Sequence, residues 1–305
     1  MSSAVEVSVI IVNYKTCELL RNCLRSVFEQ TKDISFEVIV SDNGSEDGSV
    51  EMVRNEFPQV VLVENKANLG FGAANNRGLN VAKGEFVFYL NSDTLLLNNA
   101  IKGFCDYWKG HESENLGALG CNLVDAEGTL TESHGVFPEN GKLIKAMMHH
   151  LAAFAVKNAM KFLHMDISKL RPVPVYKKFV GDVDFVIGAD LFVKKSELAR
   201  FDENFFLYYE ETDMQWRMAK IGLKRRLIDG PRVMHLVRGG RGKMDDVLRY
   251  GSFSIIQSEI SKVRYTKKNL SKSVSFALKV MILLHWLSPY IFKNTRQYFG
   301  VMRSV

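Results

Sequence analysis

The sequence EFVFYLNSD, from Glu85 to Asp93, joins an apolar run to a polar tripeptide that ends in a carboxylate. An almost wholly apolar run of this length is typical of a strand buried on both faces. In an open α/β sheet, ligands bind at the carboxyl ends of such strands, so we expect Asp93 to lie in the ligand crevice. A carboxylate there can hold Mg²⁺ or Mn²⁺, which can neutralise a diphosphate. Alternatively, residues 91–94 only cap a helix that begins near Asn98.

The same pattern occurs three times earlier in the chain. Apolar runs at residues 7–13, 36–41 and 60–63 predict strands, and the segments between them carry apolar residues at helical spacing. Four strands separated by three helices predict a parallel sheet and therefore an α/β fold. A polar residue follows each of the four strands: Asn13, Asp42, Asn68 and Asp93.

These polar residues predict a nucleotide site. Asp42 can accept a hydrogen bond from N3–H of uracil or thymine, while Asn13 and Tyr14 flank the same base. Each side chain alone also fits turn or cap chemistry. A dinucleotide site would need G-x-G-x-x-G after the first strand, but residues 13–17 read NYKTC, without glycine. The sequence therefore disfavours a hydride-transferring oxidoreductase.

Composition sets the broad class. With 305 residues and 47% hydrophobic content, the chain can form one large α/β domain with additions or two smaller domains. Its four cysteines form no C-x-x-C pair, so we expect them to be reduced and buried, as in a cytosolic protein. The first residues lack a basic region, so the apolar run after them is predicted to be a strand and not a signal peptide.

Charge is distributed unevenly along the chain. Residues 1–214 hold 21 Lys and Arg against 30 Asp and Glu, whereas residues 215–305 hold 19 against 4. A basic block of this kind can face nucleic acid, an anionic membrane or phosphate-bearing substrates. A nucleic-acid partner would account for this block alone, so no nucleic-acid binding is expected.

Four motifs, in this order, carry a family resemblance. They are VIIVNY (9–14), SDNGS (41–45), NLGFGAANNRG (68–78) and NSD (91–93). Together they resemble the family 2 glycosyltransferases of GT-A fold, with most likeness to the rhamnosyltransferase-like branch that builds bacterial surface polysaccharides. The resemblance spans residues 5–240. It implies a mostly parallel nucleotide-binding sheet flanked by helices, and inverting transfer of a sugar from dTDP-rhamnose or a UDP-sugar to a glycan or lipid-linked glycan.

The resemblance also implies a set of binding residues. Where the family has Asp-x-Asp this chain has NSD, so Asp93 alone is carried over as a ligand of Mg²⁺ or Mn²⁺. His235 matches a position that supports the cation or the diphosphate. Arg238 and Arg241 stand beside two glycines and could form a mobile loop over the phosphates. The residues expected to bind the nucleotide sugar are Asn13, Tyr14, Asp42, Asn68, Gly70, Arg77, Asn91, Ser92, Arg238 and Arg241.

The stretch FDENFFLYYEETDMQWR (201–217) resembles the acceptor-side block of the family, in which an aromatic run leads to Glu-Asp-x-Asp at a helix N-terminus. Glu211 stands where the family has Asp and is the expected general base, with Glu210 and Asp213 as the other catalytic candidates. Acidic residues in a first helical turn also complement the helix dipole. The alternative function, a catalytically silent sugar-nucleotide or glycan-binding module, would not need a base beside a metal site.

These features divide the chain into a GT-A domain, residues 1–240, and a basic amphipathic helical tail, residues 241–305. The domain has a nucleotide-binding half, 1–95, and an acceptor-binding half, 96–240. Within the latter, residues 139–178 read as a helical insertion with a stripe of Ile144, Met148, Leu151, Ala155, Ala159 and Phe162. This helix packs on the domain, covers the acceptor site or touches membrane.

The tail is predicted to attach to a membrane without crossing it. Lys279 interrupts its apolar segment, and a Lys near the centre of a spanning helix costs roughly 2.5–3.5 kcal/mol. With the basic residues, an apolar face predicts an interfacial anchor on an anionic leaflet, which places the protein in the cytoplasm, peripheral on the inner face of the membrane. A cap on the core or a homodimer interface is the alternative. The predicted face consists of Phe276, Val280, Leu283, Leu287 and Ile291.

Overall fold

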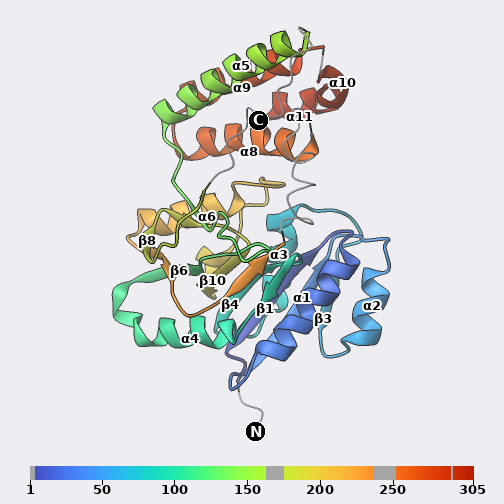
Figure 1. Cartoon of the computed structure of the whole chain (residues 1–305), viewed down its shortest axis with the longest axis vertical. Coiled ribbons are helices and arrows are strands. Elements are labelled where there is room, and N and C mark those ends of the chain that lie inside the picture. The colour runs from blue at the N-terminus through green and yellow to red at the C-terminus, as the bar shows by residue number, and fades with distance from the viewer. Residues whose placement is uncertain (1–3, 163–174, 237–251, 290) are drawn as a thin grey trace. The chain divides into compact units, whose positions relative to one another are not determined.

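The computed structural model describes residues 4–162, 175–236, 252–289 and 291–305. The chain forms two compact units (Figure 1). The sheet unit contains Met1–Phe137 and Tyr176–Met244, and the helical unit contains Pro138–Val175 and Asp245–Val305. Each unit therefore consists of two separate segments of the chain.

The sheet unit is built on eight strands in the order β3-β2-β1-β4-β10-β6-β11-β8. Its first half is the parallel sheet that the sequence predicted, and each pair of neighbouring strands keeps one register without a shift. The strands are β1 (Val7–Asn13), β2 (Phe36–Asp42), β3 (Val61–Glu64) and β4 (Phe86–Asn91), connected by α1 (Cys17–Gln30), α2 (Ser49–Glu56) and α3 (Phe71–Val81).

The second half of the sheet is mixed. A strand that the sequence analysis did not predict, β10 (Asp190–Lys194), pairs antiparallel with both β4 and β6 (Leu116–Cys121). Beyond β6, β11 (Lys224–Ile228) is parallel to it and β8 (Gly181–Val183) closes the edge. The described part of this unit also contains two short ladders and the helices α4 (Ala100–Gly110) and α6 (Glu210–Lys220). The ladders pair β5 (Thr94–Leu96) with β12 (Val233–His235) and β7 (His134–Gly135) with β9 (Phe185–Val186).

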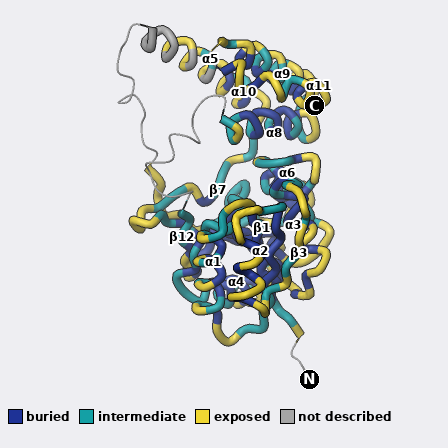
Figure 2. Tube along the Cα trace, turned by 90° about the vertical axis from the view of Figure 1, so that its right-hand side faces the viewer, coloured by how far each residue is buried: buried dark blue, intermediate teal, exposed yellow. Residues whose placement is uncertain are grey.

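Alternate residues of β4 pack into two different core layers. Phe86 and Phe88 face one side of the sheet, where their rings lie 5.3 and 6.1 Å from that of Phe192. Val87 and Tyr89 face the other side, and the Tyr89 hydroxyl donates to the Ala199 carbonyl at 2.8 Å. Both faces of the strand are thus buried, which explains why its sequence is apolar without alternation. In Figure 2, residues coloured as buried gather in the middle of the sheet unit.

The cysteines agree with the sequence analysis in all but one respect. All four are free thiols, and Cys23, Cys105 and Cys121 are buried as predicted. Cys17, at the start of α1, is only half-buried.

The helical unit has a hydrophobic core of its own. Trp286 is fully buried there, and its indole N–H donates to Oε2 of the buried Glu259 at 2.6 Å. Ser252 and Ser271 cap two of the helices, because their hydroxyls accept from N–H groups in the first turn. The helices are α5 (Asn140–Phe162), α8 (Phe253–Asn269), α9 (Lys272–Trp286), α10 (Phe292–Thr295) and α11 (Phe299–Ser304).

Two expectations about α5 differ from the structure. The sequence predicts residues 139–178 as an insertion of the acceptor half, whereas α5 packs with α9 in the helical unit (Figure 1). The predicted stripe is also displaced by one residue, because Leu143 and Met147 are buried whereas Met148 is 60% exposed. Among the helices that the structure describes, none is long and apolar enough to cross a membrane.

Candidate functional site

The polar residues at the carboxyl ends of β1 and β2 lie side by side. Asn13 lies opposite Asp42 in the register, and its amide donates to Asp42 Oδ1 at 2.7 Å and to Ser45 Oγ at 3.0 Å. Asp42 Oδ2 accepts from the backbone N–H groups of Gly44 and Ser45 at 3.0 and 2.8 Å. Asp42 thus organises the turn that follows β2, and its recognition of a pyrimidine stays a prediction.

A hydroxyl link joins this turn to the end of β4. Thr16 Oγ1 donates to Asn13 Oδ1 at 2.7 Å and lies 3.0 Å from Ser92 Oγ. Tyr14, between these groups in sequence, is 37% exposed. The structure therefore brings Asn13, Asp42 and Ser92 together, although they lie at or just after the ends of three different strands and Ser92 is 50 positions beyond Asp42 in the sequence.

Asp93 and His235 meet although 142 positions separate them in the sequence. The β5–β12 ladder places His235 opposite Thr94, so that its Nε2 lies 3.3 Å from Asp93 Oδ1. The described residues contain no group of three or more His, Cys, Asp or Glu that could hold a metal. A single carboxylate such as Asp93 nevertheless fits Mg²⁺ or Mn²⁺ when substrate phosphates supply further ligands, as is usual for Mg²⁺, and the support of His235 for the cation stays a prediction.

Asp190 is a buried carboxyl beside this pair that sequence reasoning missed. It begins β10 opposite Leu90, and its Oδ2 accepts from the Cys121 N–H at 2.8 Å. Burial raises the pKa of Asp190 to about 7, against the opposing effects of the Cys121 hydrogen bonds and of nearby His235. The available signal was a lone Asp directly before the apolar run 191–193.

The turn before α3 packs tightly against the aromatic run before α6. The Phe71 N–H donates to the Phe206 carbonyl at 2.9 Å, and Asn43 donates from its side chain to the Gly70 carbonyl at 3.1 Å. Gly70 has φ +88°, and a Cβ there would lie 2.3 Å from the Phe206 oxygen. Gly70 is thus required for close backbone approach, and Asn68 Oδ1 supports the turn by accepting the Gly70 N–H at 3.0 Å.

We predict that Gly70→Ala destabilises the fold. Its backbone conformation (φ +88°, ψ 176°) alone costs a non-glycine residue about 1–3 kcal/mol, and the contact with Phe206 adds to this. Urea unfolding should show the loss. Gly128→Ala is the matched control, because φ there is +77° but nothing lies within 4 Å, so its loss should be smaller. Equal losses in the two variants would show that the Phe206 contact is unimportant.

A strained turn sets the position of the acidic cluster. Tyr208 and Tyr209 have φ values of +67° and +70°, in a region that side-chain-bearing residues seldom adopt. α6 then begins, with Glu210 3% exposed, Asp213 fully buried and Glu211 half-buried. Strain of this kind is frequent where a loop must present a functional side chain.

The three carboxyls of this cluster differ electrostatically. Burial raises the pKa of Glu211 to about 7, and burial together with the charge of Glu211 raises the pKa of Glu210 well above its ordinary range. Asp213 instead forms an ion pair with Arg217, at 3.4 Å. A carboxyl that is partly accessible and titrates near neutral pH is suited to general-base catalysis, and Glu211 alone of the three combines these properties.

The segment 186–190 connects Glu211 to the Asp93 turn. Gln215, one helical turn after Glu211, exchanges two hydrogen bonds with the Val186 backbone, at 2.8 and 2.7 Å. A methyl group at Gly188 would come within 3.7 Å of the Glu211 Cβ. The next residue, Ala189, accepts the Asn91 N–H at 3.1 Å. The base candidate and the metal candidates therefore lie on two sides of one short segment.

Glu132 is a second residue without a predicted role. Its neighbour Ser133 accepts the Ile187 N–H at 3.2 Å, which brings this loop to the segment that contacts Glu211. The Glu132 side chain is accessible to solvent, yet surrounding atoms desolvate it and raise its pKa, and its charge helps to raise that of Glu211. The surrounding sequence is irregular, so periodicity gave no sign of this carboxyl.

The remaining predicted binding residues are three arginines. Arg77 is exposed on α3, about 9 Å along the helix from Phe71 at 1.5 Å per residue, and its role stays a prediction. Arg238 and Arg241 lie outside the described residues.

Solved structures share this architecture. Residues 1–349 of S. aureus TarS superpose with a TM-score of 0.55 at 14% identity, covering 95% of this chain and 74% of that fragment. A mannosyltransferase from Pyrobaculum calidifontis, solved with GDP-Man and Mn²⁺, gives 0.54 at 17% identity and covers 100% of this chain and 76% of that one. The GT-A fold is thus confirmed, including the mostly parallel sheet flanked by helices and the helical C-terminal region.

Comparison of the sequence also finds likeness to glycosyltransferases. Residues 8–148 match the family described as glycosyl transferase family 2. The uncharacterized glycosyltransferase YfnE of Bacillus subtilis is 37% identical over 110 residues, which cover 35% of this chain and 27% of that protein. An N-acetylglucosaminyl-diphospho-decaprenol L-rhamnosyltransferase of Mycobacterium tuberculosis is 28% identical over 214 residues, 65% of this chain and 66% of that protein. The chain thus spans about a quarter to two thirds of the length of these relatives.

Proposed function

We propose that the protein is an inverting, metal-dependent glycosyltransferase that uses a nucleoside diphosphate sugar. The observation that carries the proposal is the segment 186–190, which contacts Glu211 on one side and the turn of Asp93 on the other. A base and a diphosphate-binding pair on two sides of one short segment fit a single displacement between an acceptor hydroxyl and a nucleotide sugar. A catalytically silent binding module would have no use for a carboxyl with a pKa near neutrality.

In this mechanism the residues of the chain position the diphosphate and deprotonate the acceptor hydroxyl. Asp93 and His235 would hold Mg²⁺ or Mn²⁺, and a bound cation would neutralise charge on the departing diphosphate. Glu211 takes the proton of the acceptor hydroxyl, whose oxygen forms a bond to the anomeric carbon. The bond between that carbon and the diphosphate oxygen breaks, and its electron pair leaves with the diphosphate. Inversion follows from one displacement, without a covalent enzyme intermediate.

The names of relatives support a finer proposal for donor and acceptor. The mycobacterial relative is named for transferring L-rhamnose to a sugar linked through a diphosphate to decaprenol. A Bacillus spizizenii relative is a poly(ribitol-phosphate) beta-glucosyltransferase. We therefore propose that dTDP-rhamnose or a UDP-sugar is the donor and that a glycan or lipid-linked glycan is the acceptor, in synthesis of a surface polysaccharide.

A panel of nucleoside diphosphate sugars tests the proposal. The protein is incubated with each donor and Mn²⁺, and release of the nucleoside diphosphate is measured. Release from one or a few donors is the expected result. Tight donor binding without release or transfer, even when glycan acceptors are added, would instead favour the binding module. Calorimetric comparison of UDP with dTDP would then identify the base.

We predict that transfer slows as the pH falls through about 7. Burial raises the pKa of Glu211 to about 7, so the carboxylate is ionised above this pH and protonated below it, and only the ionised form can accept a proton. The rate at saturating donor and acceptor should therefore fall tenfold per pH unit on the acid side. Glu132→Gln should move this midpoint to lower pH, because it removes a charge that raises the pKa of Glu211. A flat profile from weakly acidic to weakly basic pH would contradict this role.

A further inference from the structure

The surface of α9 has an apolar stripe that points away from its core. Its buried residues include Leu278, Ile282 and Trp286. Four large apolar side chains on the opposite side follow a 4-4-3 spacing, which confines them to roughly 80° of the helix circumference. They are Phe276 (68% exposed), Val280 (39%), Leu284 (64%) and Leu287 (55%). We call these four residues the α9 stripe.

The α9 stripe corrects the face predicted from sequence. Ile291 lies in the core of the helical unit and Leu283 is half-buried against it. Leu284, which was not included, is 64% exposed. Single exposed apolar residues are common on protein surfaces, but a continuous stripe of four on one helix indicates contact with an apolar partner.

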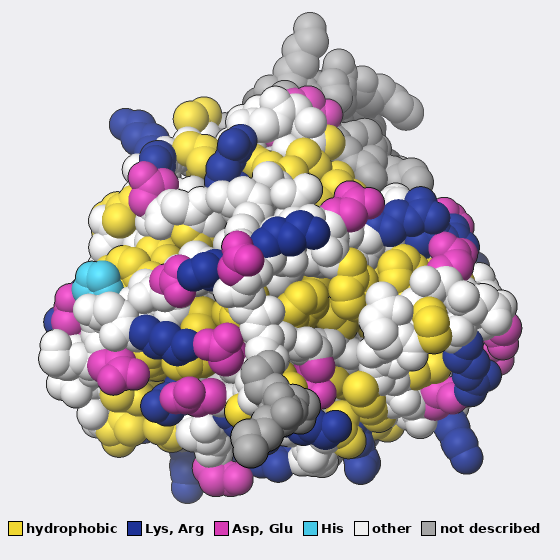
Figure 3. Space-filling model, turned by 90° about the horizontal axis from the view of Figure 1, so that it is seen from below, with side chains coloured by type: hydrophobic (Ala, Val, Ile, Leu, Met, Phe, Trp, Pro, Cys, Tyr) yellow, Lys and Arg dark blue, Asp and Glu magenta, His cyan; other side chains and the backbone are white. Residues whose placement is uncertain are grey.

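The charge around the stripe is almost entirely positive. Residues 252–305 contain nine Lys and Arg and a single acidic side chain, Glu259. Glu259 is 6% exposed and accepts the Trp286 indole N–H, so it does not offset the surface charge. On the helix, Lys272 and Lys279 lie on one flank of the stripe, and Lys279 Nζ donates to the Arg303 carbonyl at 2.9 Å. The face of the sheet unit in Figure 3, by contrast, mixes acidic and basic side chains.

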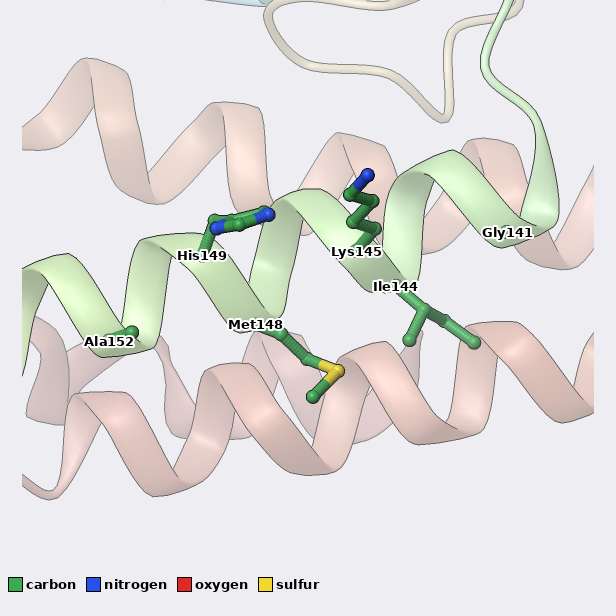
Figure 4. Close-up of a pocket in the computed structure, with 6 residues that line it drawn as sticks. All are labelled: Gly141, Ile144, Lys145, Met148, His149 and Ala152. Atoms are coloured by element: carbon green, nitrogen blue, oxygen red, sulfur yellow. The ribbon is translucent and has the colours of Figure 1, made fainter.

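The neighbouring helix α5 repeats the combination of apolar and basic residues. A shallow groove of about 390 Å³ on this helix is lined by Gly141, Ile144, Lys145, Met148, His149 and Ala152. In Figure 4, Ile144 and Met148 point to one side of the helix, whereas Lys145 and His149 point to the other. Met148 is 60% exposed. Such a pattern is typical of helices that lie at a lipid–water interface.

We propose that the α9 stripe docks on a lipid bilayer with anionic headgroups. Apolar side chains of an interfacial helix enter the boundary between headgroups and acyl chains, and each Lys or Arg near an anionic leaflet adds to the attraction. A second copy of the chain could also cover an apolar stripe. It would, however, bring two surfaces of the same positive charge together, whereas an anionic leaflet complements them. Membrane docking is independent of the transfer reaction and accounts for both the apolar α9 stripe and the positive charge around it.

Vesicle flotation with the full chain tests the inference. The vesicles contain either phosphatidylcholine alone or phosphatidylcholine with phosphatidylglycerol, at low and high salt. Wild type should float with anionic vesicles only, and less at high salt. Phe276→Ser combined with Leu284→Ser should lower the partition coefficient at least tenfold. Ile221→Ser is the matched control, because Ile221 is 61% exposed in the sheet unit, and this variant should float like wild type.

Further measurements separate the alternatives. Lys272→Glu should weaken flotation without touching the apolar residues, which keeps the inference testable if the double variant misfolds. Equal flotation with neutral vesicles, or no effect of either variant, would overturn it. If wild type is dimeric and fails to float whereas the double variant is monomeric, the α9 stripe is an interface between two copies of the chain and not a membrane-binding surface. Nucleotide release from a soluble donor without vesicles should be the same in all variants, so failure of docking is distinguishable from failure of the proposed reaction.

Discussion

Glu211→Gln is expected to lower sugar transfer by about 10²–10⁴-fold while donor binding persists. The amide keeps the shape and hydrogen-bonding capacity of the carboxyl but cannot accept the proton of the acceptor hydroxyl. Glu211 is the half-buried member of the acidic cluster, and its pKa of about 7 allows it to be ionised and still basic at neutral pH. The measurement is kcat with donor and acceptor, together with calorimetric affinity for the nucleotide.

Asp213→Asn and Glu132→Gln are the controls for this variant. Asp213 is fully buried and paired with Arg217 at 3.4 Å, so Asp213→Asn should reduce stability more than it reduces catalysis. Glu132→Gln should retain transfer with an altered pH profile. If Glu211→Gln stays active while folded Asp213→Asn is inactive, Asp213 is the base and the assignment made here is wrong.

Asp93→Ala is expected to remove turnover almost completely, by roughly 10³-fold or more, because stabilisation of a leaving diphosphate by a cation supplies several kcal/mol. Asp93 is the motif carboxylate that faces His235, at 3.3 Å. Calorimetry should show that Mn²⁺-dependent binding of a nucleoside diphosphate is lost along with kcat. Although the Asp93 side chain is only 16% exposed, it lies outside both hydrophobic core clusters of the sheet unit. The fold should therefore survive its removal.

Asp106→Ala is the matched control for a lost carboxylate. Asp106 is exposed on α4 and forms a surface ion pair with Lys102, so its removal should leave activity unchanged. Metal-dependent activity that persists in folded Asp93→Ala protein would place the cation elsewhere. His235→Ala should weaken Mn²⁺ binding less severely, since it removes a neutral ligand and leaves the carboxylate.

The parallel half of the fold was predictable because each part of it is local in sequence. The runs around Val9, Val38 and Phe88 are continuous, and β1 carries its polar residue at its end, where the register then brings Asn13 beside Asp42. β10 was missed because five residues inserted antiparallel between β4 and β6 leave no helical crossover to mark them. The partner of Asp93 was identified through resemblance, since sequence spacing alone does not bring residue 235 to residue 93.

The helical unit was harder to predict because two faces of one helix can both look apolar. On α9, Leu283 and Leu284 are adjacent in sequence, yet Leu283 packs against the core and Leu284 is exposed. A small error in helical phase exchanges such residues, and only the position of the neighbouring helices settles which one is buried. The same reason explains the displacement of one residue on α5, where Met147 is buried and Met148 is exposed.

The helical unit is assembled from two separated segments, which affects when it can fold during synthesis. α5 ends at Phe162 and its partner helix α9 begins at Lys272, so more than a hundred residues, including much of the second half of the sheet, are made between them. Leu143 and Met147 therefore lack the C-terminal part of their core cluster until the last helices have been synthesised. Apolar surface exposed in this interval favours aggregation. A chain cut after residue 240 would keep that surface exposed permanently, so removing the C-terminal helices leaves behind half of an interface.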